Sequence, residues 1–267
     1  MDFRPLKSQR LRNRTGVHGE RCRNYFIAVD ERPTLIRDRR QFPEEVNSNV
    51  LLSAQASFVT AAITGAIGIV TLSRTNEARE LPFAATPLLF ALQQAVEGLL
   101  WLNLPSAPDG WLTTMLTFLY LFFAEAFWPL YAPFAVWLIE PSVHRRNLMI
   151  VCLGVGAGVG AYLLWWLLGH PHVATIQDGH IVYVTEYRHS DAVSVAYLAA
   201  TGLPLLLSSQ RTVVVLGAIV LAGLVVAYAF YWEAFVSVWC FFAAAASVVI
   251  LCHLEWSRRQ RPRIVST

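Results

Sequence analysis

Three polar residues interrupt the apolar segment LPFAATPLLFALQQAVEGLLWLNL, which covers residues 81–104. They are Gln93, Gln94 and Glu97, and spacings of i,i+3 and i,i+4 place all three on one face of a helix. Amides donate and accept hydrogen bonds, and a carboxyl group accepts them when ionised or donates one when neutral. This face predicts part of a ligand site or hydrogen bonds between helices. For Gln93 and Gln94 we favour the hydrogen bonds.

A second carboxyl group, Glu125, lies in the segment LYLFFAEAFWPLYAP, residues 119–133. Pro129 has no N–H, so it cannot donate the usual helical hydrogen bond to the carbonyl of Glu125. We expect the helix to bend just after Glu125 and to leave that carbonyl unpaired. A bend beside a carboxylate predicts a pocket for an ion or small ligand. The alternative is a structural hydrogen bond to another helix.

A carboxylate at the middle of a membrane costs about 2.5–3.5 kcal/mol on insertion scales. Glu97 and Glu125 are therefore expected to face the interior of a helical bundle on adjacent helices, each with a polar side-chain partner. No residue is predicted to be catalytic. The predicted ligand-binding set is Gln93, Gln94, Glu97, Glu125, Ser57 and Cys240.

The composition predicts an integral membrane protein. Of the 267 residues, 55% are hydrophobic and only 15% are charged, against about 25% charged in an average soluble domain. A helix needs about 20 mainly apolar residues to span a bilayer. We predict an all-α transmembrane bundle of seven helices over residues 50–254, with the lipid bilayer and no nucleic acid as partner. The predicted spans are 50–72, 82–104, 111–139, 148–168, 192–207, 212–231 and 234–254.

Arginines in alternate loops indicate the orientation. Loops 73–81, 140–147 and 208–211 carry Arg, whereas 105–110 and 232–233 carry no Lys or Arg. The positive-inside rule then places the basic loops and the basic tail, residues 255–267, in the cytoplasm. We expect the protein in the inner membrane of a bacterial cell.

The longest outer loop, GHPHVATIQDGHIVYVTEYRHSD, covers residues 169–191. Its Asp178-Gly179 dipeptide is typical of a hairpin turn, and HIVYVT has the composition of a strand. We predict a small outer β-hairpin. His170, His172 and His180 of this loop could bind zinc or copper, although no recognised ligand spacing is present, and a solvated loop is the alternative.

The segment VCLGVGAGVGAYLLWW, residues 151–166, contains two pairs of glycines four residues apart. Such pairs let helices approach closely, either inside the bundle or in a homo-oligomer. The four residues are Gly154, Gly156, Gly158 and Gly160.

Four segments together resemble a family of uncharacterised prokaryotic multi-pass membrane proteins. They are SAQASF at 53–58, RELPFAATPLLFALQQAVEGLLWL at 79–102, WPLYAPFAVWLIEP at 128–141 and VSVWCFFAAAASVVILCH at 236–253. Members of that family begin with Met-Cys-Phe-Ser-Ala and continue with Ala-Ser-Phe. Leu51 and Leu52 stand where the family has Cys and Phe. The resemblance covers residues 50–253 and implies no particular activity.

Residues 1–49 form a polar tail that holds about half of the 21 Lys and Arg residues. Its low apolar content predicts disorder. An outward position for this tail would oppose the charge rule that the loops obey. The family's initiator Met aligns with Val50, so we expect synthesis to begin at Val50, read as Met from a GUG codon. A disordered cytoplasmic tail is the alternative.

These features favour a protein that binds, senses or transports a small ligand or ion around Glu97 and Glu125, and we favour a role that is not enzymatic. One alternative is an intramembrane metal-dependent hydrolase, because the ceramidase-like seven-helix proteins resemble this chain in span count and orientation. That chemistry needs several His, an Asp and a Ser at one level, whereas His253 is the only histidine inside a predicted span. A structural membrane subunit is the other alternative.

Overall fold

The structure is a computed structural model that describes residues 44–75, 77–177, 180–185, 191–230 and 235–260. Within α1, α7 and α8 the side chains of 44–49, 224, 226–230, 235–241, 243–244 and 257–260 are not described. All described residues belong to the unit Pro43–Thr267.

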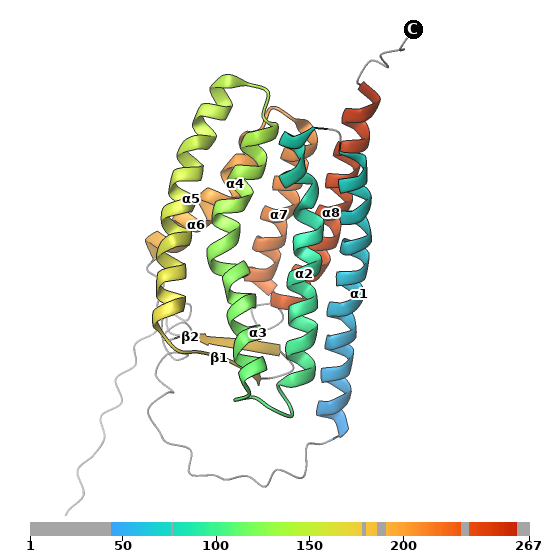
Figure 1. Ribbon diagram of the computed structural model, residues 1–267, viewed down its shortest axis with the longest axis vertical. Helices are drawn as coiled ribbons and strands as arrows, with labels where there is room; N and C mark the ends of the chain where they lie inside the picture. Colours follow the sequence, from blue (N-terminus) through green and yellow to red (C-terminus); the bar gives the residue numbers. More distant parts are fainter. Residues whose placement is uncertain (1–43, 76, 178–179, 186–190, 231–234, 261–267) are drawn as a thin grey trace, which may run out of the picture. The chain divides into compact units, whose positions relative to one another are not determined.

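Helices make up most of the described chain (Figure 1). The segments α3, η2 and α4 follow one another without a break, so the helices form seven rods. The elements are α1 (Glu44–Arg74), η1 (Ala78–Glu80), α2 (Leu81–Asn103), α3 (Trp111–Leu121), η2 (Phe122–Phe127), α4 (Trp128–Ile139), α5 (Val143–Gly169), β1 (His172–Gln177), β2 (His180–Thr185), α6 (Asp191–Leu207), α7 (Arg211–Phe230) and α8 (Phe235–Gln260).

The seven predicted helices are confirmed, with small differences at their ends. α1 begins at Glu44 rather than at Val50, and α8 continues to Gln260, beyond the predicted end at Leu254. Part of each predicted tail is therefore helical. Four described helical segments are long and apolar enough to cross a membrane, namely Val50–Arg74, Ala78–Asn103, Trp111–Ile139 and Val143–Gly169. Among the residues whose side chains are described, the apolar stretches of the last three helices are shorter, namely Asp191–Leu207, Arg211–Gly223 and Ala245–Trp256, so seven crossings stay a prediction.

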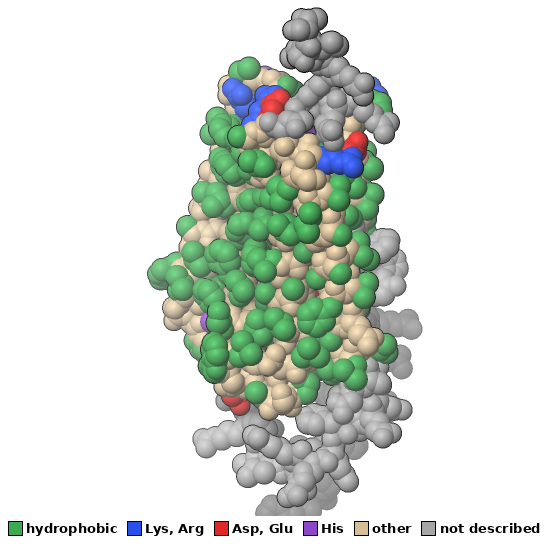
Figure 2. Space-filling model, turned by 45° about the vertical axis from the view of Figure 1, so that its right-hand side comes forward, with side chains coloured by type: hydrophobic (Ala, Val, Ile, Leu, Met, Phe, Trp, Pro, Cys, Tyr) green, Lys and Arg blue, Asp and Glu red, His purple; other side chains and the backbone are tan. Residues whose placement is uncertain are grey.

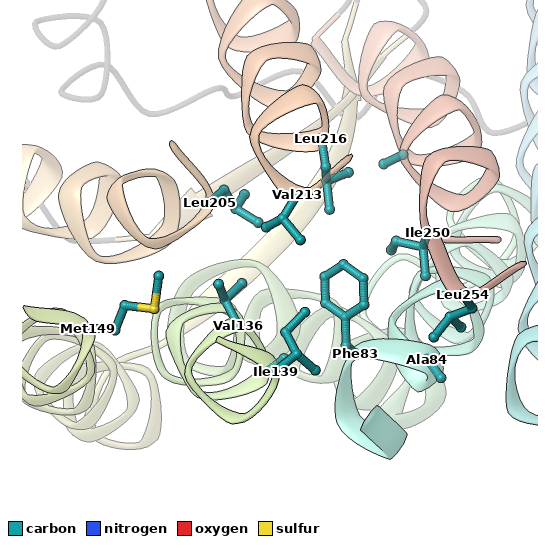
Figure 3. Packing of buried hydrophobic residues seen from close by; sticks show 12 residues of the cluster. Phe83, Ala84, Val136, Ile139, Met149, Leu205, Val213, Leu216, Ile250 and Leu254 are labelled. Atoms are coloured by element: carbon teal, nitrogen blue, oxygen red, sulfur yellow. The ribbon is translucent and has the colours of Figure 1, made fainter. Parts of the chain in front are cut away.

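Successive rods run up and down, with α1 and α5 on opposite sides of the bundle (Figure 1). α1 packs against α2 and α8, whereas α5 packs against η2, α4 and α6. The core between these helices holds twelve buried apolar side chains, ten of which are labelled in Figure 3. They include Phe83 from α2, Val136 from α4, Met149 from α5 and Ile250 from α8, so this cluster joins most of the bundle.

The predicted outer hairpin is confirmed. β1 pairs with β2 in antiparallel register, with His172 opposite Thr185 and Gln177 opposite His180. The predicted turn at Asp178-Gly179 lies outside the described residues. Ala174 and Ile181 are buried together with side chains of α2 and α3. The rings of Tyr120 and Tyr183 stack at 4.5 Å, so the hairpin closes one end of the bundle against α3.

The glycines of α5 divide into two faces with different surroundings. A Cβ on Gly156 would overlap the carbonyl oxygen of Pro129, and one on Gly160 would lie 2.5 Å from the carbonyl oxygen of Ala126. A Cβ on Gly154 or Gly158 would meet nothing within 4 Å. The pair Gly156/Gly160 thus permits close packing of α5 against η2 and α4. This is the first of the two expected roles, close approach of helices inside the bundle.

Two loops at the opposite end from the hairpin are joined by Glu140, a residue that sequence reasoning did not single out. Its carboxylate accepts hydrogen bonds from the hydroxyl groups of Ser208 and Ser209, at 2.8 and 2.5 Å. It also accepts from the backbone N–H groups of Ser142 and Ser209, at 3.1 and 2.9 Å. Arg145 donates to the carbonyl oxygens of Leu207 and Ser208, both at 2.9 Å. The α4–α5 and α6–α7 connections are therefore held together by charge-assisted hydrogen bonds.

These hydrogen bonds also set the ionisation of Glu140. Burial alone would raise the pKa of this carboxyl, but the donors from Ser209, Ser208 and Ser142 stabilise the charged form. They hold the pKa of Glu140 below its ordinary value of 4.5.

We predict that Gly156→Ala destabilises the fold by about 1–3 kcal/mol, because α5 must move away from the Pro129 carbonyl. Gly158→Ala is the matched control, with the same change on the same helix but open space around it. It should be neutral or stabilising by up to about 1 kcal/mol through helix propensity. Thermal unfolding of both variants in one detergent measures the difference. Equal melting temperatures would contradict the packing described for Gly156.

We predict that Glu140→Gln destabilises the fold by about 1–3 kcal/mol, because an amide cannot accept from all four donors. The control is Asp109→Asn, the same chemical change in an exposed loop residue. The pKa of Glu140 is lower in the folded state than its ordinary value of 4.5. The ionised carboxylate therefore contributes its full share to the free energy of unfolding above pH 4.5, and this share is lost as the pH falls through the folded-state pKa. Unfolding followed between pH 7 and the acid range should show the gap between wild type and Glu140→Gln narrowing on acidification.

Candidate functional site

A cavity of about 450 Å³ lies inside the bundle. Side chains from α2, α3, η2, α4, α5, α6, α7 and α8 line it, whereas α1 contributes none of the described lining residues. Most of the lining is apolar or aromatic. The polar exceptions are Thr86, Gln93, Glu125, Ser194 and Thr201, together with the hydroxyl groups of three tyrosines. A mainly apolar cavity with a few converging polar groups is the usual form of a small-ligand site.

Glu125 lies in a π-helical segment rather than at a simple proline bend. In η2 the N–H of Trp128 donates to the carbonyl of Phe123, five residues earlier. This wider spacing inserts one extra residue into the turn, as π-helical segments do at many functional sites. The side chain of Glu125 lines the cavity from this segment.

One carbonyl of this segment, that of Ala124, accepts a hydrogen bond from a side chain of another helix. With π spacing, the missing N–H of Pro129 faces Ala124, five residues earlier. The hydroxyl of Tyr197, on α6, donates to this carbonyl at 2.6 Å. Tyr197 thus replaces the backbone donor and fixes α6 beside the cavity.

Gln93 is the second predicted residue at the cavity, and it has a structural partner. The indole N–H of Trp128 donates to the side-chain oxygen of Gln93 at 2.8 Å, and both residues are buried and line the cavity. The Phe90 and Trp128 rings lie 4.7 Å apart on the same wall. This bond between α2 and α4 accords with the structural role favoured for Gln93.

Glu97 lies elsewhere, between α1 and α2. Its carboxyl is fully buried and accepts a hydrogen bond from the Ser57 hydroxyl at 3.4 Å, a long distance for such a bond. Neither Glu97, Ser57 nor Gln94 is among the lining residues of the cavity. Glu97 and Glu125 both face the bundle interior, as predicted, but they do not form one pocket. The side chain of Cys240 lies outside the described residues.

Glu97 has the predicted polar partner in Ser57, whereas the described residues include no side-chain hydrogen-bond donor to the Glu125 carboxyl. Within the described part of the chain, no side chain donates a hydrogen bond to the Glu125 carboxyl and no basic side chain forms an ion pair with it. The interhelical hydrogen bond, one of the two alternatives for Glu125, is not present among the described residues. The other alternative, that Glu125 belongs to a ligand pocket, agrees with its position in the wall of the cavity.

Two of the three outer histidines make local contacts. The His170 ring stacks on Trp166 at 3.6 Å, and the His172 ring lies 5.7 Å from that of Phe118. Among the described residues, no group of three His, Cys, Asp or Glu side chains could hold a metal ion. Residues 178–179 and 186–190 of the same loop are not described, so zinc or copper at His170, His172 and His180 stays a prediction.

Sequence reasoning missed several residues of the cavity. Tyr197, Trp128 and Tyr120 line it, and Tyr197 and Trp128 also hold its walls together through hydrogen bonds. A signal existed for Tyr197, since an aromatic residue with a hydroxyl in an apolar helix needs a hydrogen-bond partner. No sequence feature indicated that the partner would be the carbonyl released by Pro129.

Fold and cavity together define a class: a bundle built from long apolar helices, capped by a hairpin, with a carboxyl, that of Glu125, among the described residues of its cavity. The chain belongs to the family of unknown function DUF6629, whose sequence model matches residues 50–266. Membership of an uncharacterised family was expected from the sequence and is confirmed. Comparisons with curated proteins and with solved structures give no significant match.

We predict that Tyr197→Phe destabilises the fold by about 1–3 kcal/mol, because the Ala124 carbonyl loses its donor in a buried position. Pro129→Ala restores a backbone N–H at position 129 and with it a donor for this turn of the helix. The double-mutant cycle of the two changes, read from thermal unfolding, should therefore show Tyr197→Phe costing less in the Pro129→Ala background. An equal cost in both backgrounds would contradict the replacement of the proline N–H by Tyr197.

Proposed function

We propose that this protein is a multi-pass membrane protein that binds a small, mainly apolar ligand in the cavity beside Glu125. The single observation that carries the proposal is the cavity itself, which is about 450 Å³ in volume and collects most of its polar groups from α2, η2, α4 and α6. A volume of this size fits ligands of the drug-sized class.

The outer surface supports a membrane location. Large apolar side chains are exposed along the bundle, for example Ile69 at 65%, Val151 at 65% and Val195 at 65%. Figure 2 shows apolar side chains over the middle of one face and charged side chains at its ends. A soluble monomer rarely exposes continuous apolar patches of this extent, whereas a bilayer covers them.

The distribution of arginines supports one orientation. Arg74, Arg79, Arg145, Arg146 and Arg211 all lie at or beside helix ends that meet at the end of the bundle opposite the hairpin. On the positive-inside rule this end, and with it the C-terminus, faces the cytoplasm of the cell. The hairpin and the nearby part of the cavity then face outward.

The described residues support ligand binding. Transport or sensing would each require this binding as a first step. No observation favours the metal-dependent hydrolase. The structural-subunit alternative differs from binding in one testable respect, because a subunit with only a structural role has no need of an accessible cavity.

The test is a cavity-filling substitution combined with an apolar probe. Ala132 on α4 lines the cavity, and Ala132→Trp should fill part of it. Leu130→Trp introduces the same ring on the same helix at a side chain that is 45% exposed, and it serves as the control. The probe is neopentylbenzene, with the protein in phosphatidylcholine nanodiscs and empty discs measured in parallel.

We expect wild type and Leu130→Trp to bind neopentylbenzene saturably above the empty discs, with about one equivalent per protein. Ala132→Trp should bind at least about tenfold more weakly, a change of about 1.4 kcal/mol. Equilibrium dialysis gives both affinity and stoichiometry. Binding that Ala132→Trp leaves unchanged, or no saturable binding to wild type, would overturn the proposal.

A further inference from the structure

Among the described lining residues of the cavity, one carboxyl group can carry a full charge. Among its lining residues within the described chain, Glu125 is the only Asp or Glu, and none is Lys, Arg or His. Two ion pairs, Arg74–Glu255 and Arg79–Glu77, are present in the described residues, and both lie at the helix ends opposite the hairpin. No basic side chain of the described bundle therefore neutralises Glu125.

Three hydrogen-bond donors of the cavity wall, on Tyr197, Trp128 and Thr201, are already used within the bundle. Tyr197 interacts electrostatically with Glu125, but its hydroxyl hydrogen is donated to the Ala124 carbonyl. The indole N–H of Trp128 is donated to Gln93, and the Thr201 hydroxyl to the carbonyl of Tyr197. These three donors are therefore not available to an anion, and Glu125 is the one ionisable carboxyl among the described lining residues, which favours a positively charged guest over an anion.

Aromatic rings supply the remaining recognition. Phe90, Trp128 and Tyr131 line the cavity from α2 and α4, and Tyr120 and Tyr197 from α3 and α6. Aromatic ring faces attract organic cations, and this attraction is larger where water is excluded. The same rings and the surrounding aliphatic side chains favour an apolar body on the guest. Among the described residues no three His, Cys, Asp or Glu side chains come together to hold an inorganic cation, and the lining offers such a cation a single carboxylate.

We propose that the ligand of this cavity is an organic monocation, an ammonium group on an apolar body, with the Glu125 carboxylate as its counter-ion. The inference rests on the proposed binding function and adds to it the charge and chemical class of the ligand. The ammonium group lies between Glu125 and the aromatic wall, and the apolar body extends among the aliphatic side chains.

The experiment compares two probes of one shape and different charge. Benzyltrimethylammonium is the cation, and neopentylbenzene is its neutral carbon isostere. Both are titrated by equilibrium dialysis into full-length protein in zwitterionic phosphatidylcholine nanodiscs, with empty discs as background. The proteins are wild type, Glu125→Gln as the neutral isostere of the carboxylate, and Asp109→Asn as the same change at an exposed loop carboxylate.

We expect the ratio of cation affinity to isostere affinity to fall at least about tenfold from wild type to Glu125→Gln, which corresponds to about 1.4 kcal/mol. Asp109→Asn should keep the wild-type ratio, and neopentylbenzene should bind wild type and Glu125→Gln alike. If Glu125→Gln does not fold, Glu125→Asp retains the charge, and it should keep a preference for the cation that Glu125→Ala lacks.

The two proposals fail in different ways. If neopentylbenzene binds saturably but the affinity ratio is the same in wild type and Glu125→Gln, the cation proposal is overturned and the binding function stands. A ratio that falls equally in Asp109→Asn also overturns it, because the effect is then one of net charge. If neither probe binds wild type above empty discs, the binding function and the cation proposal fail together.

Discussion

The absence of an N–H on Pro129 is the constraint on which the centre of this structure depends. A helix that crosses an apolar environment must satisfy its carbonyls internally, because lipid and apolar side chains offer no donors. The chain meets this requirement with the π-helical segment Phe122–Phe127 and with the Tyr197 hydroxyl from α6. The position of α6, the width of the cavity beside it and the direction of Glu125 all follow from this arrangement.

Pro129 also bears on the glycines of α5, together with Pro133, four residues later in α4. Pro133 has no N–H to donate to the carbonyl of Pro129, and the backbone of α5 passes close to that carbonyl at Gly156. Gly160 passes close to Ala126 one turn away. The long contact between α5 and the irregular helix therefore requires residues without side chains, and the two outward glycines are not part of it.

Polar contacts are divided by their position along the bundle. At the end opposite the hairpin, Glu140 and Arg145 satisfy loop backbone groups and hold two connections together. In the middle, Gln93 and Trp128 join α2 to α4, while Ser57 and Glu97 join α1 to α2. Glu125 differs from these groups because it lines the cavity and no described side chain donates a hydrogen bond to its carboxyl, and this difference is the reason to assign it to a ligand rather than to the fold.

Hydrophobic segment length and turn chemistry by themselves determined the seven helices and the hairpin, because both signals are local. A run of about 20 apolar residues specifies a long helix wherever it packs, and the alternating segment around 172–185 specifies paired strands. The polar residues Gln93, Glu97 and Glu125 were also identified from the sequence alone, since a polar group in an apolar helix carries a cost that demands a partner.

Only the tertiary structure decided which of these residues share a site. Glu97 and Gln93 are one helical turn apart, yet Glu97 faces α1 and Gln93 faces the cavity, because α2 packs on both sides. The Ala124 carbonyl in the π-helical turn accepts its hydrogen bond from the Tyr197 hydroxyl, which belongs to a residue 73 positions away in the chain. Such contacts depend on how whole helices are placed against one another, and no local pattern of residues specifies that placement.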